Sequence, residues 1–474
     1  MALNSFTFLV LFLPFSVLCV SLLRDHYRVG AARNGLLFLS LVFYAWDGPF
    51  SFVLLLSSIT FNWAIGEALV AQNATPRARK RWLTLALIVN VGLLSVFKYA
   101  AATVHLVGAY AGIDLGVPAL GFPLGLSFFT LTQVMYVVDC YEGQIARKSW
   151  IEHATFISLF TNITAGPLLR ARQFYSQVGE LGTQVNRSDR LAMYAVLVCL
   201  GLLKKVVLGN SFAKISAAGY SHVDQLSTLE GWLTMLAGTF ELYFDFSGYS
   251  DMAFGCAGLL GLSLVRNFNS PFLANTISDF WKRWHISLSQ FITTYLYTPM
   301  LRLMGRATLR TSAIATLLSM IVAGIWHGAS WNFVLFGVLH GAALAGYQYW
   351  KQRKLKLADS VAVPLTFLFV SLAFVTVSAP NLGGVWDLVT SLAPRANLLD
   401  LSILRAGISQ SDQRMLLIPV LVGSALAFAG PTAESIAKRF RPALRTDIAI
   451  VCMLLVAYVY MSAAGPVEFR YRQF

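Results

Sequence analysis

The sequence predicts an all-α polytopic membrane protein, in which helices cross a lipid bilayer many times. Of its 474 residues, 57% are hydrophobic and only 12% are charged, whereas about 25% of residues are charged in a typical soluble domain. The mean hydropathy is +0.64. The apolar residues form long runs, as expected of helices that satisfy their backbone hydrogen bonds internally because lipid offers no partners.

The apolar runs follow one another along the whole chain, and several are shorter than the roughly 20 residues that a full span requires. We therefore expect about eleven to thirteen membrane segments, some of them re-entrant, around a transmembrane tunnel. They make one transmembrane domain over residues 1–464, followed by a short tail, 465–474. The runs lie at residues 5–23, 34–46, 50–71, 82–104, 118–139, 151–168, 189–208, 230–262, 281–300, 311–349, 359–379, 415–431 and 447–464.

The first run is expected to remain as a transmembrane helix. No basic segment precedes Phe6–Leu23 and no small-residue cleavage motif follows it, so it does not resemble a signal peptide. Basic clusters lie next to several runs and belong on the cytoplasmic side of a membrane. They place both chain termini on the external, periplasm-like side of the membrane, and they predict that the run at 311–349 enters and returns. The clusters lie at residues 24–33, 77–81, 302–310, 351–356 and 438–445.

The net charge of +14 is distributed over these short loops. This pattern indicates membrane topology and contact with lipid, and it argues against a nucleic-acid partner. The five cysteines are isolated and lie in or beside apolar runs. Their spacing predicts small buried side chains and neither a disulfide framework nor a metal site.

The tripeptide Trp326-His327-Gly328 interrupts the longest apolar run. Polar breaks at membrane depth are costly and usually line a cavity or a pathway. Gly324 and Gly328 would let another backbone approach closely, and a neutral imidazole can accept a proton from a hydroxyl near neutral pH. His327 is therefore a candidate general base. The alternative is a histidine that only forms a hydrogen bond between two helices.

A second Trp-His pair, Trp284-His285, follows the basic residues Lys282 and Arg283. His285 is a second candidate site histidine. Lys282, Arg283 and Trp284 are candidate contacts for an acyl donor, because cationic side chains bind the phosphates of coenzyme A or of a carrier-protein phosphopantetheine. The alternative is that the two cations extend to the membrane surface as ordinary interfacial residues.

The few acidic residues of the chain include Asp245, in the segment 240–251. A carboxylate at membrane depth must be paired or hydrated. We expect Asp245 to form a structural ion pair; it could instead orient a histidine or contact a helix end. The basic residues considered as its partner are Arg266, Lys282 and Arg283.

Taken together in chain order, these motifs resemble the membrane-bound O-acyltransferase family, in the branch that modifies bacterial polysaccharides. The resemblance implies helices around a tunnel, His327 as the essential histidine and His285 as the second site histidine. One segment departs from the family pattern, because Met300–Arg306 replaces the Gly-rich loop of many relatives. The matching segments are residues 122–128, 165–167, 245–251, 267–272, 279–289 and 324–337.

The C-terminus also resembles a motif of related acyltransferases or of their small partner peptides. Phe469, Tyr471 and Phe474 form a Phe-x-Tyr-x-x-Phe ending, and the related motif is proposed to carry the acyl group on tyrosine. A phenol becomes a competent nucleophile when an imidazole takes its proton. Tyr471 is thus a candidate acyl relay; the alternative is that the tail is an aromatic anchor at the membrane surface.

The resemblance implies that an acyl thioester, acetyl-coenzyme A in the first instance, is the donor substrate, and that the enzyme holds no bound cofactor and no metal. A periplasmic SGNH-hydrolase-like acyltransferase is the expected partner, and an exported polysaccharide is the expected acceptor. Within the same class, D-alanyl transfer to a teichoic-acid-like polymer is the alternative. Outside it, a non-catalytic transporter or a scaffold subunit of a polysaccharide export complex remains open.

Overall fold

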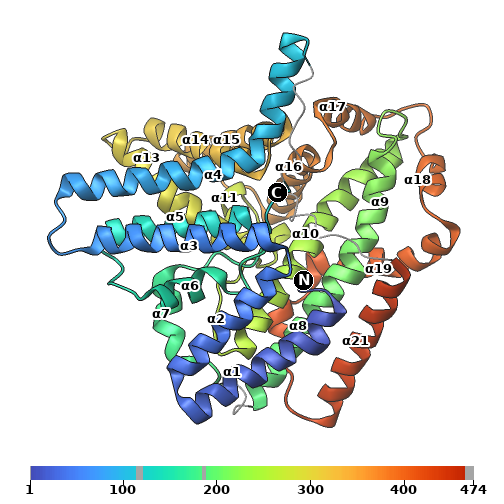
Figure 1. Cartoon of the computed structure of the whole chain (residues 1–474). Helices are drawn as coiled ribbons and strands as arrows, with labels where there is room; N and C mark the ends of the chain where they lie inside the picture. The colour runs from blue at the N-terminus through green and yellow to red at the C-terminus, as the bar shows by residue number, and fades with distance from the viewer. Residues whose placement is uncertain (1, 114–120, 184–187, 465–474) are drawn as a thin grey trace.

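The prediction of an all-α polytopic membrane protein is confirmed. The computed structural model describes residues 2–113, 121–183 and 188–464, and within them every regular element is a helix (Figure 1). Seven of the described helices are long and apolar enough to cross a membrane, and two shorter apolar helices lie at Val29–Ala45 and Ile418–Ala429. The other predicted segments are shorter, broken or more polar. The seven are Phe8–Tyr27, Pro49–Val70, Pro76–Val104, Ser188–Tyr220, Leu309–His327, Asp359–Ser378 and Leu444–Ser462.

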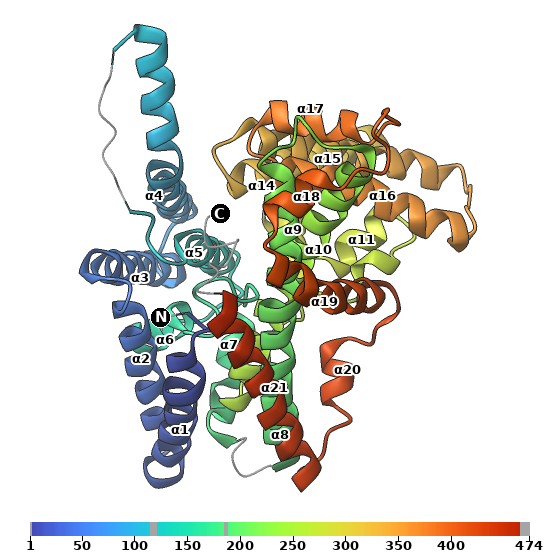
Figure 2. The ribbon, with the colours of Figure 1, turned by 90° about the vertical axis from the view of Figure 1, so that its right-hand side faces the viewer.

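The N-terminal third forms one group of helices on one side of the molecule (Figures 1 and 2). Proline opens both α3 and α4, where its missing N–H costs nothing because the first turn has no partner for that donor. The C-terminal part of the long helix α4 projects away from the rest (Figure 2). The elements are η1 (Phe8–Phe12), α1 (Leu13–Tyr27), α2 (Val29–Ala45), α3 (Pro49–Val70), α4 (Pro76–Ala111), α5 (Leu126–Tyr141), α6 (Trp150–Ser158), α7 (Ala171–Gln177) and η2 (Val178–Glu180).

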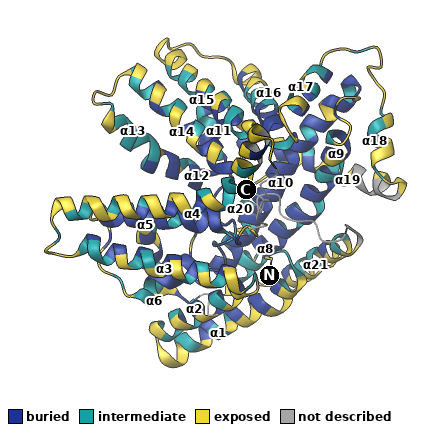
Figure 3. Cartoon of the chain, turned by 45° about the horizontal axis from the view of Figure 1, so that its top comes forward, coloured by how far each residue is buried: buried dark blue, intermediate teal, exposed yellow. Residues whose placement is uncertain are grey.

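The helix α10 lies at the centre and is buried along most of its length, whereas the outer helices expose one face (Figure 3). It packs closely on α8 because both carry glycine at the contact: a Cβ on Gly201 would lie 2.6 Å from the carbonyl oxygen of Gly248. The elements are α8 (Ser188–Leu203), the π-helical turn η4 (Lys204–Gly209), α9 (Asn210–Tyr220) and α10 (Thr228–Leu259).

The predicted ion pair of Asp245 exists, but all three predicted partners are wrong. Asp245 pairs with Lys205, which is itself buried, and six residues further along α10 Asp251 pairs with Lys204 at 2.8 Å. Both lysines lie in η4, where the π-helical turn brings consecutive side chains toward α10. The basic residues expected to pair with Asp245 lie elsewhere; Arg266 pairs with Glu434 and Arg283 with Asp279.

The C-terminal half contains the predicted entering and returning segment, which folds as the helical hairpin α14–α15. Glycine again permits the close approach, since a Cβ on Gly324 would lie 2.2 Å from the carbonyl oxygen of Phe333. The elements are η5 (Pro271–Leu273), α11 (Ile277–Arg283), α12 (Ile286–Phe291), η6 (Ile292–Tyr297), α13 (Thr298–Leu303), α14 (Leu309–His327), α15 (Trp331–Gln352), α16 (Asp359–Ser378), α17 (Leu382–Ser391), α18 (Ser402–Gly407), α19 (Gln410–Ala429), α20 (Ala433–Ala437) and α21 (Leu444–Ala464).

Candidate active site

His327 is the last residue of α14, at the turn of the hairpin. The final carbonyl groups of a helix have no partner within it, and cations near them are favourable. Here α4 supplies the partners: the Lys98 ammonium donates to the carbonyl oxygen of Trp326, and the Tyr99 hydroxyl donates to that of Ile325. Lys98 also lies over the Trp326 indole, 5.2 Å from its centroid. The end of α14 that carries His327 is therefore held by two side chains of α4.

His285 lies at the break between α11 and α12, in a left-handed backbone conformation with φ 42° and ψ 54°. Asn267 holds this break. Its carbonyl oxygen accepts from the backbone N–H of Ile286 at 3.0 Å, and its side-chain oxygen accepts from that of Ser287 at 3.1 Å. The Asn267–Phe272 segment, singled out by sequence, therefore fixes the position of His285.

The imidazole of His285 is almost completely buried in an aromatic environment. Its exposed fraction is 1%, and the ring stands edge-on to Phe246 with centroids 4.6 Å apart. Among the residues that the structure describes, neither ring nitrogen of His285 has a hydrogen-bond partner. A buried imidazole with both nitrogens available is unusual, because buried polar atoms are normally paired. It suits a group that meets its partner only when substrate enters.

The two histidines line the same small cavity, of ≈ 10 Å³. Leu288 and Val377 are among the apolar side chains that complete its wall. The structure therefore brings together the two histidines that the sequence singled out, although their catalytic roles remain predictions. The full lining is Leu242, Trp281, Trp284, His285, Leu288, His327, Phe336, Phe374 and Val377.

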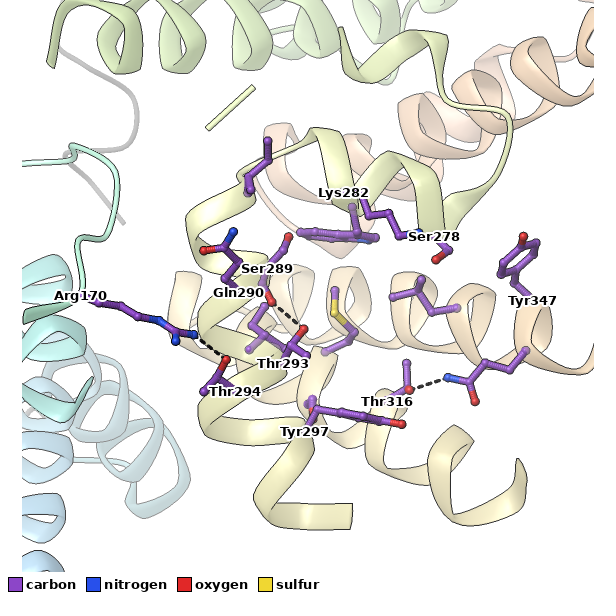
Figure 4. Close-up of a pocket in the computed structure, with 17 residues that line it drawn as sticks. Arg170, Ser278, Lys282, Ser289, Gln290, Thr293, Thr294, Tyr297, Thr316 and Tyr347 are labelled. Atoms are coloured by element: carbon purple, nitrogen blue, oxygen red, sulfur yellow. Dashed lines mark hydrogen bonds between the residues drawn. The ribbon is translucent and has the colours of Figure 1, made fainter. Parts of the chain in front are cut away.

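A much larger pocket, of ≈ 540 Å³, lies between the α11–η6 segment and the α14–α15 hairpin (Figure 4). Its wall is mostly apolar surface with several polar side chains, Ser289, Thr293 and Gln348 among them. Arg170 reaches in from the residue before α7 and donates to the Thr294 hydroxyl at 2.7 Å (Figure 4). Its size is that of a small-molecule site.

The three predicted donor contacts have different surroundings. Lys282 lines the large pocket (Figure 4). Arg283 forms an ion pair with Asp279, with 2.8 Å between its Nε and the carboxylate oxygen. Trp284 is buried and lines the histidine cavity. Of the side chains named in the two linings, that of Trp281 is shared, so its indole borders both the large pocket and the histidine cavity.

Comparison with known proteins identifies the class of molecule that holds this site. The model of the membrane-bound O-acyltransferase family matches residues 35–356. The chain belongs to this family. The resemblance inferred from the motifs is thereby confirmed, and the protein is a multi-pass membrane acyltransferase. The matched range contains both site histidines and Lys98.

Several named proteins are similar to this acyltransferase. One from Azotobacter vinelandii, named probable alginate O-acetylase, is 34% identical over 407 residues, or 83% of this chain and 78% of that protein. A peptidoglycan O-acetyltransferase from Helicobacter pylori is 33% identical over 80% of this chain and 77% of its own length. A teichoic acid D-alanyltransferase from Streptococcus thermophilus is 28% identical over 49% of this chain and 58% of its own length.

Two residues of this acyltransferase site were missed by sequence reasoning. His340, on α15, is fully buried, and its Nδ1 accepts from the Trp281 indole N–H at 3.3 Å. Lys98 is the sole charged residue of the apolar run at 82–104. Each carried a usable signal, because a lone ionisable residue at membrane depth is a functional candidate by default.

The predicted relay, Tyr471, belongs to the tail at residues 465–474, which lies outside the described residues. The division of this acyltransferase into a transmembrane domain, 1–464, and a tail therefore remains a prediction. So does the role of Tyr471 as an acyl carrier.

Proposed function

We propose that this membrane-bound O-acyltransferase moves an acetyl group from a cytoplasmic acyl thioester, such as acetyl-coenzyme A, across the inner membrane for O-acetylation of an exported polysaccharide. One observation carries the proposal. Two buried histidines share a cavity, and Trp281 borders both this cavity and a pocket large enough for a small-molecule donor. The names of two relatives, an alginate O-acetylase and a peptidoglycan O-acetyltransferase, support a polymer acceptor.

The donor binds in the large pocket. Arg170 and Lys282 are its cationic lining residues, and they would contact the phosphates of coenzyme A or of phosphopantetheine. The thioester end of the donor then points toward Trp281 and the histidines behind it. Binding the remote phosphates fixes the carbonyl carbon relative to His327, which lowers the entropic cost of the reaction.

His327 acts as general base. It takes the proton of an attacking hydroxyl while that oxygen bonds to the thioester carbonyl carbon. The carbon–sulfur bond then breaks, and the imidazolium returns the proton to the thiolate. His285, whose nitrogens have no partner among the described residues, would donate to the oxyanion that forms in between.

Substitution of His327 tests this proposal. His327→Ala should lower thioester-dependent acyl transfer by about 10²- to 10⁴-fold, with expression and membrane insertion unchanged. Transfer is measured with radiolabelled acetyl-coenzyme A in membrane vesicles, and acetylation of the polymer by NMR. Unchanged acetylation in His327→Ala would leave a scaffold or transporter role in place of catalysis.

The acyl group leaves the site on the tail tyrosine, from which a periplasmic SGNH-hydrolase-like partner takes it to a sugar hydroxyl. Tyr471→Phe removes the nucleophilic oxygen and keeps the ring. Loss of transfer in this variant, with normal insertion, is the expected result. If the tail is only an interfacial anchor, phenylalanine will substitute without loss.

This route requires both chain termini to lie in the periplasm, as the basic clusters predict. The proposal places residues 77–81 and 438–445 on the cytoplasmic side. Single cysteines introduced at Phe474 and at Arg81, in a background without the five native cysteines, test this with a membrane-impermeant reagent. Labelling at 474 in intact cells and at 81 only after permeabilisation is expected; the reverse pattern would overturn the route.

D-alanyl transfer to a teichoic-acid-like polymer is the second candidate. The similarity to a teichoic acid D-alanyltransferase favours it, although that similarity covers less of both chains than the similarity to the acetylases. The two candidates differ in the acyl group, and the histidine cavity bears on that choice.

A further inference from the structure

We infer that the histidine cavity admits a small, uncharged acyl group, and that Trp281 and Phe336 set this limit. The inference rests on the proposed function and names its substrate more closely. It is carried by the volume of the cavity, by the chemistry of its wall and by the contacts that hold Trp281 in place.

The volume of the histidine cavity limits the size of the acyl group. The carbonyl carbon of the donor must reach His327, so the group attached to it must fit beside the two imidazoles. The cavity offers ≈ 10 Å³, which is about the room for one water molecule. Its wall consists of large side chains, including Trp281, Trp284 and Phe336. A methyl group needs the least rearrangement of this wall, and each added carbon needs more.

The wall of the histidine cavity also disfavours a charged acyl group. Apart from the two histidines the wall is apolar, and no carboxylate is part of it in the described chain. The nearby acid Asp245 pairs with Lys205 and does not line the cavity, nor does Glu241. The ammonium of a D-alanyl group would therefore lose its hydration without gaining a counter-charge. Aromatic faces attract a cation, but they offset only part of that loss.

The wall is also held firmly. The Trp281 indole N–H donates to Nδ1 of His340 at 3.3 Å. The His340 ring packs against Phe336, with centroids 4.5 Å apart, and lies 5.2 Å from the Trp281 ring. His340 is thus a positioning residue, which keeps Trp281 between the donor pocket and the histidines. Because a larger acyl group could enter only by disturbing these contacts, the small cavity selects against it.

Acyl donors of the same shape but different charge test the effects of size and of charge separately. Isobutyryl- and D-alanyl-coenzyme A have nearly the same shape, but only the second carries an ammonium. In membrane vesicles, transfer from acetyl-coenzyme A should exceed transfer from isobutyryl-coenzyme A by about 100-fold or more, because each methylene is worth about 10- to 200-fold in a tight pocket. Transfer from D-alanyl-coenzyme A should be lower still. Equal or greater use of D-alanyl-coenzyme A would overturn the inference.

Variants that widen the histidine cavity give a second test of the size limit. Phe336→Ala should raise isobutyryl transfer relative to acetyl transfer by about tenfold or more, without raising D-alanyl transfer. Val377→Ala, a smaller change in the same wall, serves if Phe336→Ala does not fold. Leu344→Ala, which lines the donor pocket but not the histidine cavity, is the control and should keep the wild-type ratio.

The outcomes distinguish this inference from the proposed function. If acetyl transfer persists in His327→Ala, the proposed function fails. If acetyl transfer requires His327 but the acyl preference is the same in the wild type, Phe336→Ala and Val377→Ala, only the cavity argument fails. His340→Ala should also relax the preference, since it releases Trp281; an unchanged preference there would refute the positioning role of His340.

Discussion

The two site histidines face one cavity but are held in place by different kinds of contact. His327 ends a long helix, and its position depends on α4, whose Lys98 and Tyr99 bond to the last carbonyl groups of α14. His285 lies between two short helices in a left-handed backbone conformation, and its position depends on Asn267. The first therefore relies on contact between distant helices, and the second on hydrogen bonds within one chain segment, residues 267–287.

The two histidines also differ in the free energy of their backbone conformations. A left-handed conformation costs a residue other than glycine about 1–3 kcal/mol. Each intramolecular hydrogen bond contributes about 1 kcal/mol net, so the two bonds to Asn267 roughly offset the strain at His285. At His327 there is no such strain, because this residue belongs to a regular α-helix and does not have a positive φ. The geometry at His285 is thus the more fragile of the two.

The largest expected effect distinguishes the chemical roles of the two histidines. Glutamine can donate a hydrogen bond but cannot serve as a base near neutral pH. His327→Gln should therefore lose as much transfer as His327→Ala, about 10²- to 10⁴-fold. His285→Gln should retain at least tenfold more activity than His285→Ala, because an oxyanion donor is worth about 10²- to 10³-fold. Rates are measured with acetyl-coenzyme A in vesicles. If glutamine restores activity at position 327 but not at position 285, His327 is the oxyanion donor and His285 the general base.

The next effect tests the loop that holds His285. Asn267→Ala removes the acceptor of the Ser287 N–H and the contact of its amide with Ser250. It should lower the free energy of unfolding by about 1–3 kcal/mol and transfer by about 10- to 100-fold. Asn269→Ala is the matched control, since that side chain is exposed in the same segment. Thermal unfolding in detergent and transfer are measured together; equal results for both variants would contradict the role of Asn267.

The contrast also explains what the sequence could and could not predict. Apolar runs and basic clusters are local patterns, so the helical class and the α14–α15 hairpin were predictable. Both histidines were visible because each interrupts an apolar run. The position of Lys98 beside Trp326 depends on packing between α4 and α14, which no local pattern encodes. Asp245 was assigned the wrong partners because the π-helical turn at Lys204–Gly209 shifts the register of its side chains.

A smaller effect tests the support of His327 from α4. Lys98→Met keeps most of the side-chain volume but removes the ammonium that bonds to the Trp326 carbonyl oxygen. It should lower kcat about tenfold, since a charged hydrogen bond contributes about 1.5–3 kcal/mol. KM for the donor should stay the same, because Lys98 does not line the donor pocket.

Two further variants of α4 sharpen this test. Lys98→Arg restores a charged donor and should recover part of kcat. Lys80→Met, on the exposed face near the start of α4, should leave both constants at wild-type values. A rise in KM with normal kcat in Lys98→Met would place Lys98 in donor binding and remove it from the support of His327.

The smallest expected effect comes from Tyr99. Tyr99→Phe removes one neutral hydrogen bond, that to the Ile325 carbonyl oxygen, and keeps the ring. Because a neutral hydrogen bond contributes about 1 kcal/mol net, the cost should be about that size. Transfer should fall no more than about fivefold. If Lys98 and Tyr99 hold the same helix end, Tyr99→Phe should cost less in a Lys98→Met background than in the wild type, because that end is already released. Strict additivity in this double-mutant cycle would mean that the two side chains act separately, and that His327 does not depend on α4 as His285 depends on Asn267.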